Sequence, residues 1–303
     1  MPELPEVEVI RRGLSRVLPG RKIVLFQVLE TRSYPDFDDD TKQWLLRARV
    51  VDVNRRGKLL LIGLNASYGQ QPERTLLVHL RMTGQLVYRS AEAEADLDAS
   101  GGFGSASMIG QLPDKSTRIV IAFDDGSYLY FNDQRKFGYM KLVTAEQLAQ
   151  DSFYRGLGPE PLAEGFDWRQ LRRALSGEGR QVSKTSVKAA LLDQNKVAGI
   201  GNIYADESLF KARIDPRRSV DSLSVAEYKR LLAAIRECLT LSIDAGGSTA
   251  RNYVDALGFR GEYLDLHAQV YNRSGQPCVR CKHEITKIRV AGRGTHICPK
   301  CQR

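Results

Sequence analysis

Two Cys-x-x-Cys pairs near the C-terminus constrain this chain more than any other feature. Cys278 and Cys281 are separated by 16 residues from Cys298 and Cys301. Two such pairs supply four thiolates for one tetrahedral zinc ion, and a module this small needs the metal's folding energy. Because cysteines fill all four positions, we predict one structural Zn²⁺. The alternative, two disulfides, is disfavoured in a reducing compartment.

The segment around these cysteines is also strongly basic. Residues 268–303 contain eight Lys and Arg residues and one Glu, which accounts for most of the net charge of +9. We predict strands at 285–290 and 295–297 joined by a turn at 291–294, with Arg293 at the tip of this hairpin. A guanidinium there suits a phosphate, but a solvated arginine explains the pattern equally well.

The rest of the chain divides into a β-rich part and a helical part. A length of 303 residues predicts two or three domains. A helical pattern ends at Pro19-Gly20, and short β-rich runs follow, with a hairpin signal at Asp125-Gly126. From about residue 150 the pattern is helical, and Cys238 falls on an apolar helical stripe as a core residue. The predicted fold class is therefore α+β and multidomain. We expect a β-sandwich or barrel-like domain with a short N-terminal helix at 1–145, a helical domain at 146–267 and a zinc finger at 268–303.

Two further features bear on the surroundings of the protein. Residues 90–114 carry five acidic and no basic side chains, so we expect a surface insertion that points away from anionic ligands. No apolar run approaches the roughly 18 residues that a membrane span requires, and the first eight residues do not resemble a secretory signal. We therefore expect a cytoplasmic protein without membrane contact.

The N-terminus offers a nucleophile. Met1 precedes Pro2, and its removal would expose a secondary amine. An α-amino group has a pKa of about 7.7–8.0, so part of it is neutral and nucleophilic at pH 7. Glu3 and Glu6 lie close enough in sequence to move protons. From these residues alone, an acidic first helical turn that suits the helix dipole is the simpler interpretation.

The string Met-Pro-Glu-Leu-Pro-Glu-Val-Glu at residues 1–8, with the four-cysteine tail, resembles the formamidopyrimidine-DNA glycosylases. These bacterial base-excision enzymes remove 8-oxoguanine and ring-opened purines. The resemblance runs along the chain, through motifs at 56–58, 79–84, 133–138, 157–162, 201–207, 246–249 and 269–271. It implies a helix-two-turn-helix in the helical domain, a β-hairpin zinc finger, a monomer, and damaged double-stranded DNA as partner.

The resemblance also assigns chemical roles. Pro2 matches the nucleophile that attacks C1′ and forms a Schiff base, after which β- and δ-elimination cleave the strand. Glu3 matches the acid/base carboxylate, and Glu6 matches an acidic position that holds the proline amine. Lys58 matches the lysine that contacts the lesion and donates a proton in β-elimination. Arg293 matches the zinc-hairpin arginine of δ-elimination, which favours the functional interpretation of that residue.

DNA contacts follow from the same resemblance. Residues that match wedges in the duplex or contacts to the DNA backbone are Met82, Arg135, Phe137, Lys184 and Asn202. An apolar wedge fills the gap left by an extruded base and kinks the duplex. From spacing alone, Met82 and Phe137 are better explained as strand core. Residues 246–264 match a mobile loop that closes over the extruded base.

The sequence departs from the family at a few positions, and two other functions stay open. Gln134 and Lys136 replace residues of an Asp-Pro-Arg-Arg-Phe-Gly motif, and Ser116 stands where a DNA-contacting histidine is usual. One alternative is an endonuclease VIII-like glycosylase for oxidised pyrimidines, although Leu4 favours the purine enzymes. The other is a non-catalytic zinc protein that binds damaged DNA.

Overall fold

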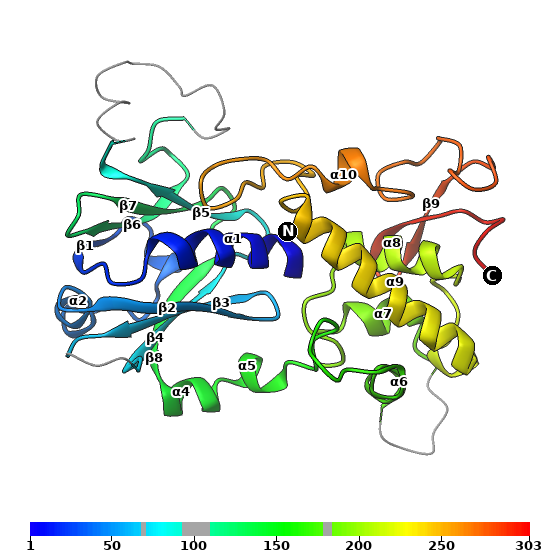
Figure 1. Cartoon of the computed structure of the whole chain (residues 1–303), viewed down its shortest axis with the longest axis horizontal. Helices are drawn as coiled ribbons and strands as arrows, with labels where there is room; N and C mark the ends of the chain where they lie inside the picture. The colour runs from blue at the N-terminus through cyan, green and yellow to red at the C-terminus, as the bar shows by residue number, and fades with distance from the viewer. Residues whose placement is uncertain (68–70, 93–109, 178–183) are drawn as a thin grey trace. The chain divides into compact units, whose positions relative to one another are not determined.

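The computed structural model describes residues 1–67, 71–92, 110–177 and 184–303 (Figure 1). Most of the predicted acidic insertion at 90–114 therefore lies outside the described residues. Contacts within the chain group the described residues into two compact units. One, the N-terminal unit, comprises Met1–Arg155 and Ala245–Glu262, and the other, the C-terminal unit, comprises Gly156–Asp244 and Tyr263–Arg303.

The N-terminal unit contains two antiparallel sheets, each with four strands among the described residues. The first has the order β2-β3-β4-β8, with β2 Arg49–Arg56, β3 Leu59–Asn65, β4 Arg74–His79 and β8 Tyr139–Thr144. The second has the order β1-β6-β7-β5, with β1 Ile23–Val28, β6 Thr117–Phe123, β7 Tyr128–Asp133 and β5 Gly84–Arg89. Side chains from both sheets share one hydrophobic core. The predicted β-sandwich is confirmed.

Helix α1, Leu4–Val17, begins at a capping box. Glu3 is the N-cap, and the Glu6 carboxylate accepts a hydrogen bond of 2.8 Å from the Glu3 backbone N–H. The apolar stripe of the helix, with Val7, Ile10 and Leu14 fully buried, packs into the core of the sandwich. The packing and the cap together fix where the first residues of the chain lie.

A half-buried arginine connects α1 to strand β2. Arg55 Nε donates to Glu8 Oε2 of α1 at 3.1 Å, and its other guanidinium end donates to the Gly57 carbonyl oxygen at 2.9 Å. Gly57 and Lys58 form the two-residue turn between β2 and β3, and Gly57 adopts a φ of +58° that favours glycine. The turn that carries Lys58 is thereby held relative to α1.

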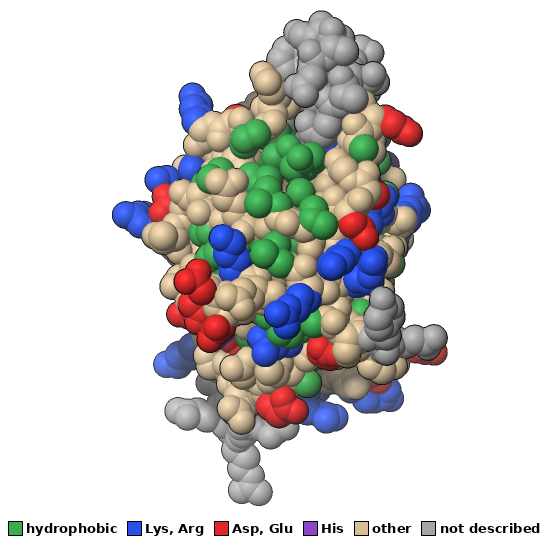
Figure 2. All heavy atoms as spheres, turned by 90° about the vertical axis from the view of Figure 1, so that its left-hand side faces the viewer, with side chains coloured by type: hydrophobic (Ala, Val, Ile, Leu, Met, Phe, Trp, Pro, Cys, Tyr) green, Lys and Arg blue, Asp and Glu red, His purple; other side chains and the backbone are tan. Residues whose placement is uncertain are grey.

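Short helical segments complete the N-terminal unit. They are η1 Thr31–Ser33, α2 Asp39–Leu45, α4 Ala145–Gln150 and most of α5 Ser152–Gly156. Figure 2 shows the side of this unit that lies at the left of Figure 1. Hydrophobic side chains gather near the centre of that face, with acidic and basic side chains interspersed around them. Among the described residues, basic side chains form no continuous band on this face.

The C-terminal unit is built around the buried helix α8 and the longer helix α9, which buries one face. Its helical segments are α6 Trp168–Ser176, α7 Val187–Leu192, α8 Asn202–Ala212, η2 Val220–Ser222, α9 Val225–Asp244 and α10 Tyr263–Leu266. Helix α8 is buried along nearly its whole length and packs against α9, where Cys238 is a core residue as predicted. No helix among the described residues is long and apolar enough to cross a membrane.

The zinc-finger hairpin packs on helix α8. Strands β9 Thr286–Val290 and β10 Arg293–Ile297 pair antiparallel. Phe210 of α8 forms a small core with Ile285 and the zinc-binding cysteines. Glu207 of α8 is buried, and its carboxylate accepts the backbone N–H groups of residues 269, 270 and 271 at 2.7–2.9 Å. Burial raises the pKa of Glu207 despite these hydrogen bonds.

These contacts explain why the grouping differs from the division predicted at 1–145, 146–267 and 268–303. The zinc finger shares a core with α8, so it belongs to the same unit as the helices. Residues 245–262 belong to the N-terminal unit instead, since the Tyr88 N–H donates to the Ala256 carbonyl at 2.7 Å and Tyr253 lies in the sandwich core. The predicted domain boundaries themselves stay predictions.

The ion pair between Glu8 of α1 and Arg55 of β2 predicts that the stability of the fold depends on pH. Burial would raise the pKa of Glu8, but hydrogen bonds from Arg11, Arg12 and Arg55 outweigh it and lower that pKa from 4.5 to about 2. Because the pKa of Glu8 is lower in the folded state, its ionised carboxylate stabilises the fold at pH values above the unfolded pKa of about 4.5. This stabilisation is lost as the pH falls towards about 2.

We expect Glu8→Gln to lower the free energy of unfolding by about 1–2 kcal/mol at pH 7, after allowance for solvent screening. The difference from the unsubstituted protein should shrink steadily below about pH 4.5. Urea unfolding between pH 7 and pH 3 measures it, with Glu164→Gln at an exposed position as control. A difference that does not vary with pH would contradict the assignment.

Candidate active site

The N-terminal residues form a buried acidic cluster at the start of α1. Met1 is 49% exposed, whereas Pro2 is buried and Glu3 and Glu6 are only 2% and 1% exposed. The Pro2 nitrogen is a peptide nitrogen while Met1 is present, and it becomes a secondary amine when Met1 is removed. The structure thus brings the predicted nucleophile and both predicted carboxylates together within one helical turn.

Glu6 holds two segments of the chain with one carboxylate. Its Oε2 accepts the Glu3 N–H, and its Oε1 accepts the Ser248 N–H, both at 2.8 Å. The Tyr253 hydroxyl donates to the Glu6 carbonyl oxygen at 3.3 Å, and burial raises the Tyr253 pKa far above its usual value, so this donor stays protonated. The contact to Ser248 ties residues 245–262 to the start of α1, a role of Glu6 that sequence reasoning missed.

Lys58 lies buried beside a neutral histidine. The side chain is 5% exposed in the turn between β2 and β3. Burial lowers the pKa of His79 to about 3, and the positive charges of Arg81 and Lys58 contribute to this shift. The Nδ1 atom of His79 accepts the Arg81 N–H at 3.1 Å, so its hydrogen sits on Nε2. Sequence reasoning did not single out His79, although it opens the motif at 79–84.

The predicted wedge residues lie on two loops of the N-terminal unit. Met82 is half-buried in the turn between β4 and β5, and Arg135 and Phe137 lie between β7 and β8. Phe137 is 54% exposed, with the Arg135 guanidinium 4.7 Å from its ring centroid. The strand-core alternative is therefore wrong for Phe137, because an unpaired loop carries its ring into solvent.

The four cysteines of the tail meet at one point. Their sulfur atoms lie within 4.8 Å of one another, with Cys278 and Cys301 at 3.8 Å and Cys281 and Cys298 at 3.4 Å. Zn–S bonds of about 2.3 Å in a tetrahedron place sulfurs about 3.8 Å apart. The four thiols therefore fit one structural zinc ion, as predicted.

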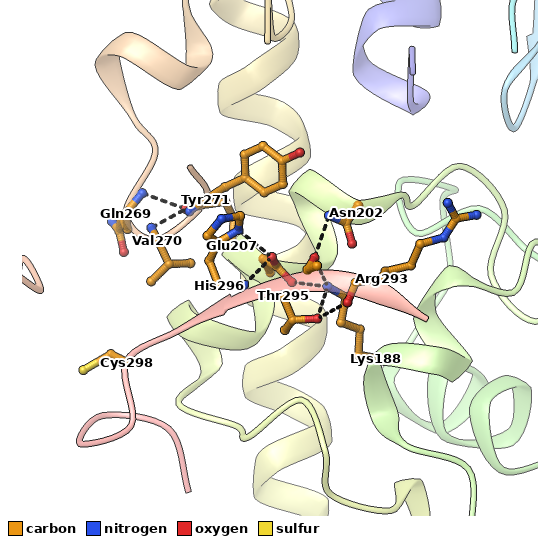
Figure 3. Close-up of polar contacts among 12 residues, drawn as sticks. Lys188, Asn202, Glu207, Gln269, Val270, Tyr271, Arg293, Thr295, His296 and Cys298 are labelled. Carbon is orange, nitrogen blue, oxygen red and sulfur yellow. Dashed lines mark hydrogen bonds and ion pairs between the residues drawn. The ribbon is translucent and has the colours of Figure 1, made fainter. Parts of the chain in front are cut away.

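The zinc hairpin presents Arg293 directly after a tight turn. Ala291 and Gly292 form this turn with φ of 50° and 72°, so it has two residues where the sequence predicted four. Arg293 is the exposed first residue of β10, and its side chain points away from the labelled polar cluster (Figure 3). Asn202, at the start of α8, donates to the Gly294 carbonyl oxygen at 3.0 Å, which holds the strand next to Arg293.

A buried ion pair fixes the same strand. Lys188 of α7 and Asp206 of α8 are fully buried at 2.6 Å from each other. Lys188 also donates to Thr295 Oγ1 at 2.7 Å, and Asp206 accepts the His296 N–H at 2.8 Å. Sequence reasoning missed this pair, because a lysine and an aspartate in helices look like surface residues until the hairpin covers them.

The predicted site residues fall into two groups, one in each unit. The N-terminal unit carries the proposed nucleophile, the carboxylates, the lysine and the wedge loops. The C-terminal unit carries Asn202, Arg293, the zinc ligands and Lys184, which is exposed just before α7. Asn202 donates a side-chain N–H to Gly294 within the chain. Its predicted phosphate contact would therefore need the second N–H of the side-chain amide or the backbone N–H.

Comparison with known families matches three consecutive parts of the chain. Residues 1–140 match the formamidopyrimidine-DNA glycosylase N-terminal domain, and residues 157–254 match the formamidopyrimidine-DNA glycosylase H2TH domain. Residues 275–303 match the zinc finger found in FPG and IleRS. The matched regions follow the sandwich, the helices and the hairpin of the structure.

Individual relatives match over their whole length. The chain is 39% identical over 303 residues to the formamidopyrimidine-DNA glycosylase of Desulfitobacterium hafniense, covering 100% of both chains. It is 40% identical over 307 residues to that of Herpetosiphon aurantiacus, again covering 100% of both. The structure of Lactococcus lactis Fpg in complex with an abasic site containing DNA has a TM-score of 0.82 and 34% identity, over 99% of each chain. This chain therefore belongs to the formamidopyrimidine-DNA glycosylase family.

Proposed function

We propose that this protein is a base-excision DNA repair enzyme, a bifunctional glycosylase and AP lyase for oxidised purines. Its substrates would be 8-oxoguanine and formamidopyrimidines in double-stranded DNA. The observation that carries the proposal is the buried cluster of Pro2, Glu3 and Glu6 at the start of α1, in a chain that matches this family from end to end. Solved Lactococcus lactis relatives are complexes with DNA that contains Fapy-dG or an abasic site.

The chemistry begins at the Pro2 nitrogen once Met1 is removed. The neutral amine attacks C1′, a nitrogen–carbon bond forms, and the damaged base leaves with the electrons of the glycosidic bond. The amine then loses its proton, the C1′–O4′ bond breaks as O4′ takes up a proton, and the nitrogen lone pair forms an iminium ion with C1′. A secondary amine yields an iminium with no N–H to lose, so it stays cationic and withdraws electrons from C2′. The C2′ proton is then removed and the 3′ phosphate leaves; a second elimination releases the 5′ phosphate.

The buried side chains around Pro2 suit the proton transfers. Glu3 is the proposed acid/base for ring opening and elimination, and its burial excludes competing water. Glu6 keeps the start of α1 in place, since both its oxygens hold backbone N–H groups. Lys58 is the proposed lesion contact and proton donor in β-elimination. Arg293 is the proposed phosphate ligand of δ-elimination.

Other parts of the chain are proposed to open the duplex and to bind the DNA backbone. Met82, Arg135 and Phe137 are proposed to replace the extruded nucleotide, with the guanidinium facing the orphaned cytosine. Lys184 and Asn202 are proposed backbone contacts, which would be salt-sensitive and independent of sequence. Four cysteine thiolates would fill the tetrahedral coordination of a zinc ion and leave no position for substrate. The proposed role of the zinc ion is therefore to hold the hairpin in shape. We further propose that the protein acts in the cytoplasm as a monomer.

Borohydride trapping tests the nucleophile. Reduction of the iminium gives a stable amine, so the unsubstituted protein should form a covalent product with a duplex that contains 8-oxoguanine opposite cytosine. Pro2→Gly should cleave the strand at least about tenfold more slowly, a loss of about 1.4 kcal/mol of transition-state stabilisation. It should still bind a duplex with an uncleavable abasic analogue.

The controls for this experiment separate the alternatives. Intact mass first establishes that Met1 has been removed. Faster trapping with an oxidised pyrimidine would identify an endonuclease VIII-like specificity with the same mechanism. No trapping with either lesion would favour a damage-binding protein, and unchanged cleavage by Pro2→Gly would exclude Pro2 as nucleophile.

Metal content and DNA affinity test the zinc hairpin. Cys298→Ser removes one of four zinc ligands, so we expect loss of bound zinc and at least about a tenfold weaker binding to abasic-analogue DNA. Cys238→Ser makes the same change at a buried cysteine outside the zinc site and should keep one zinc per chain. Normal DNA binding by a zinc-free Cys298→Ser protein would contradict the role given to the hairpin.

A further inference from the structure

One buried carboxylate holds both loops that carry the proposed wedge residues. Asp133, the last residue of β7, is 0% exposed. Its Oδ1 accepts the Thr83 hydroxyl and the Arg135 N–H, the latter at 3.1 Å. Its Oδ2 accepts the N–H groups of Phe137 at 2.8 Å and Gly138 at 2.7 Å. Four donors therefore satisfy one buried charge.

Thr83 joins the two loops through the same hydroxyl. It lies in the turn between β4 and β5, directly after Met82. The hydroxyl donates to Asp133 and accepts the Arg135 N–H at 3.0 Å. The loop with Met82 and the loop with Arg135 and Phe137 are thus connected by hydrogen bonds, although 50 residues separate Thr83 from Asp133 in sequence.

The surroundings leave these loops little freedom. A Cβ on Gly84 would lie 2.4 Å from the Leu80 carbonyl oxygen, and one on Gly138 would lie 2.7 Å from the Phe131 ring. The Asp133 backbone is also held, since its N–H donates to the Ser116 carbonyl at 2.8 Å and its carbonyl accepts from Arg118 Nε at 2.7 Å. The backbone of Asp133 is therefore held by contacts that do not involve its carboxylate.

This arrangement supports exposed side chains. Phe137 is 54% exposed and Arg135 is exposed, so the hydrogen bonds do not serve to bury either of them. A carboxylate removed from water is costly unless donors surround it. Both loops pass from one sheet of the sandwich to the other, since β4 and β8 belong to the first sheet and β5 and β7 to the second. What the hydrogen bonds provide is a fixed direction for two side chains that protrude into solvent.

We propose that Asp133 and Thr83 are positioning residues that make Met82, Arg135 and Phe137 one preformed wedge. The inference rests on the proposed function, in which these three side chains enter the duplex. Loops that were free before binding would lose conformational entropy on insertion, which weakens the contact. Loops already held by Asp133 avoid that loss, and they carry the guanidinium and the apolar side chains into the base stack in fixed register.

Three substitutions separate positioning from simple stability. Thr83→Val removes the bridging hydroxyl at nearly constant shape, and Thr83→Ser keeps it. Thr75→Val is the control: it makes the same Thr-to-Val change on strand β4. Thr75 pairs with Gly63 and Val143 and lies outside both loops. Should Thr83→Val not fold, Thr83→Ala removes the same hydroxyl without adding a methyl group.

Two probes read different steps. One is a duplex with 8-oxoguanine opposite cytosine or adenine and 2-aminopurine beside the lesion, whose fluorescence reports unstacking. The other is a single-stranded oligonucleotide with an abasic site, which needs no wedge to be cleaved. Thr83→Val should reduce unstacking and excision on the duplex about tenfold and reduce the preference for cytosine, with the single strand cleaved at the normal rate. Thr83→Ser and Thr75→Val should behave as the unsubstituted protein.

Other outcomes overturn the inference. Equal losses on duplex and single strand would mean that Thr83 acts on stability alone, and normal duplex opening by folded Thr83→Val would show that the loops need no bridge. Failure of the unsubstituted protein to cleave either substrate would refute the proposed function instead, while the 2-aminopurine signal would still report whether Thr83 governs insertion.

Discussion

The carboxylate of Glu6 is the contact on which the N-terminal site depends. One oxygen closes the capping box of α1 and the other holds Ser248, a residue 242 positions away. A single charge therefore determines where the helix begins and where residues 245–262 pass it. The proposed nucleophile, Pro2, directly precedes the capped turn, so its position follows from a helix cap and from the apolar stripe that anchors the helix in the sandwich.

Other buried charged side chains hold distant segments together in the same way, in both units. Asp133 holds the two wedge loops, Glu207 holds residues 269–271, and Lys188 with Asp206 holds the zinc hairpin. In each case a buried charge is satisfied by backbone N–H groups or by an opposite charge, which limits the cost of its desolvation. Removing one partner of such a group is far more costly than removing a surface ion pair, so these positions tolerate little change. Two of these contacts, those of Asp133 and of Lys188, fix segments next to the exposed side chains of Phe137 and Arg293.

Some elements were predictable because their signals are local. The cysteine spacing predicted the zinc site, since four thiolates at that separation have few other uses. The Asp125-Gly126 turn, the capped start of α1 and the apolar stripe that contains Cys238 each follow from neighbouring residues. Other elements depend on partners distant in sequence. Phe137 looks like strand core in its local pattern, but the Asp133 carboxylate turns its loop outward after β7.

Periodicity, spacing and residue order are enough to predict the β-sandwich, the helical region, the zinc ligands and the family to which the chain belongs. The residues that hold the proposed catalytic and wedge side chains in place are found only in the folded chain. Glu6 with Ser248, Asp133 with Thr83, and Lys188 with Thr295 lie between 50 and 242 residues apart. A hydrogen bond depends on distance and direction in space, and neither is set until the core has packed.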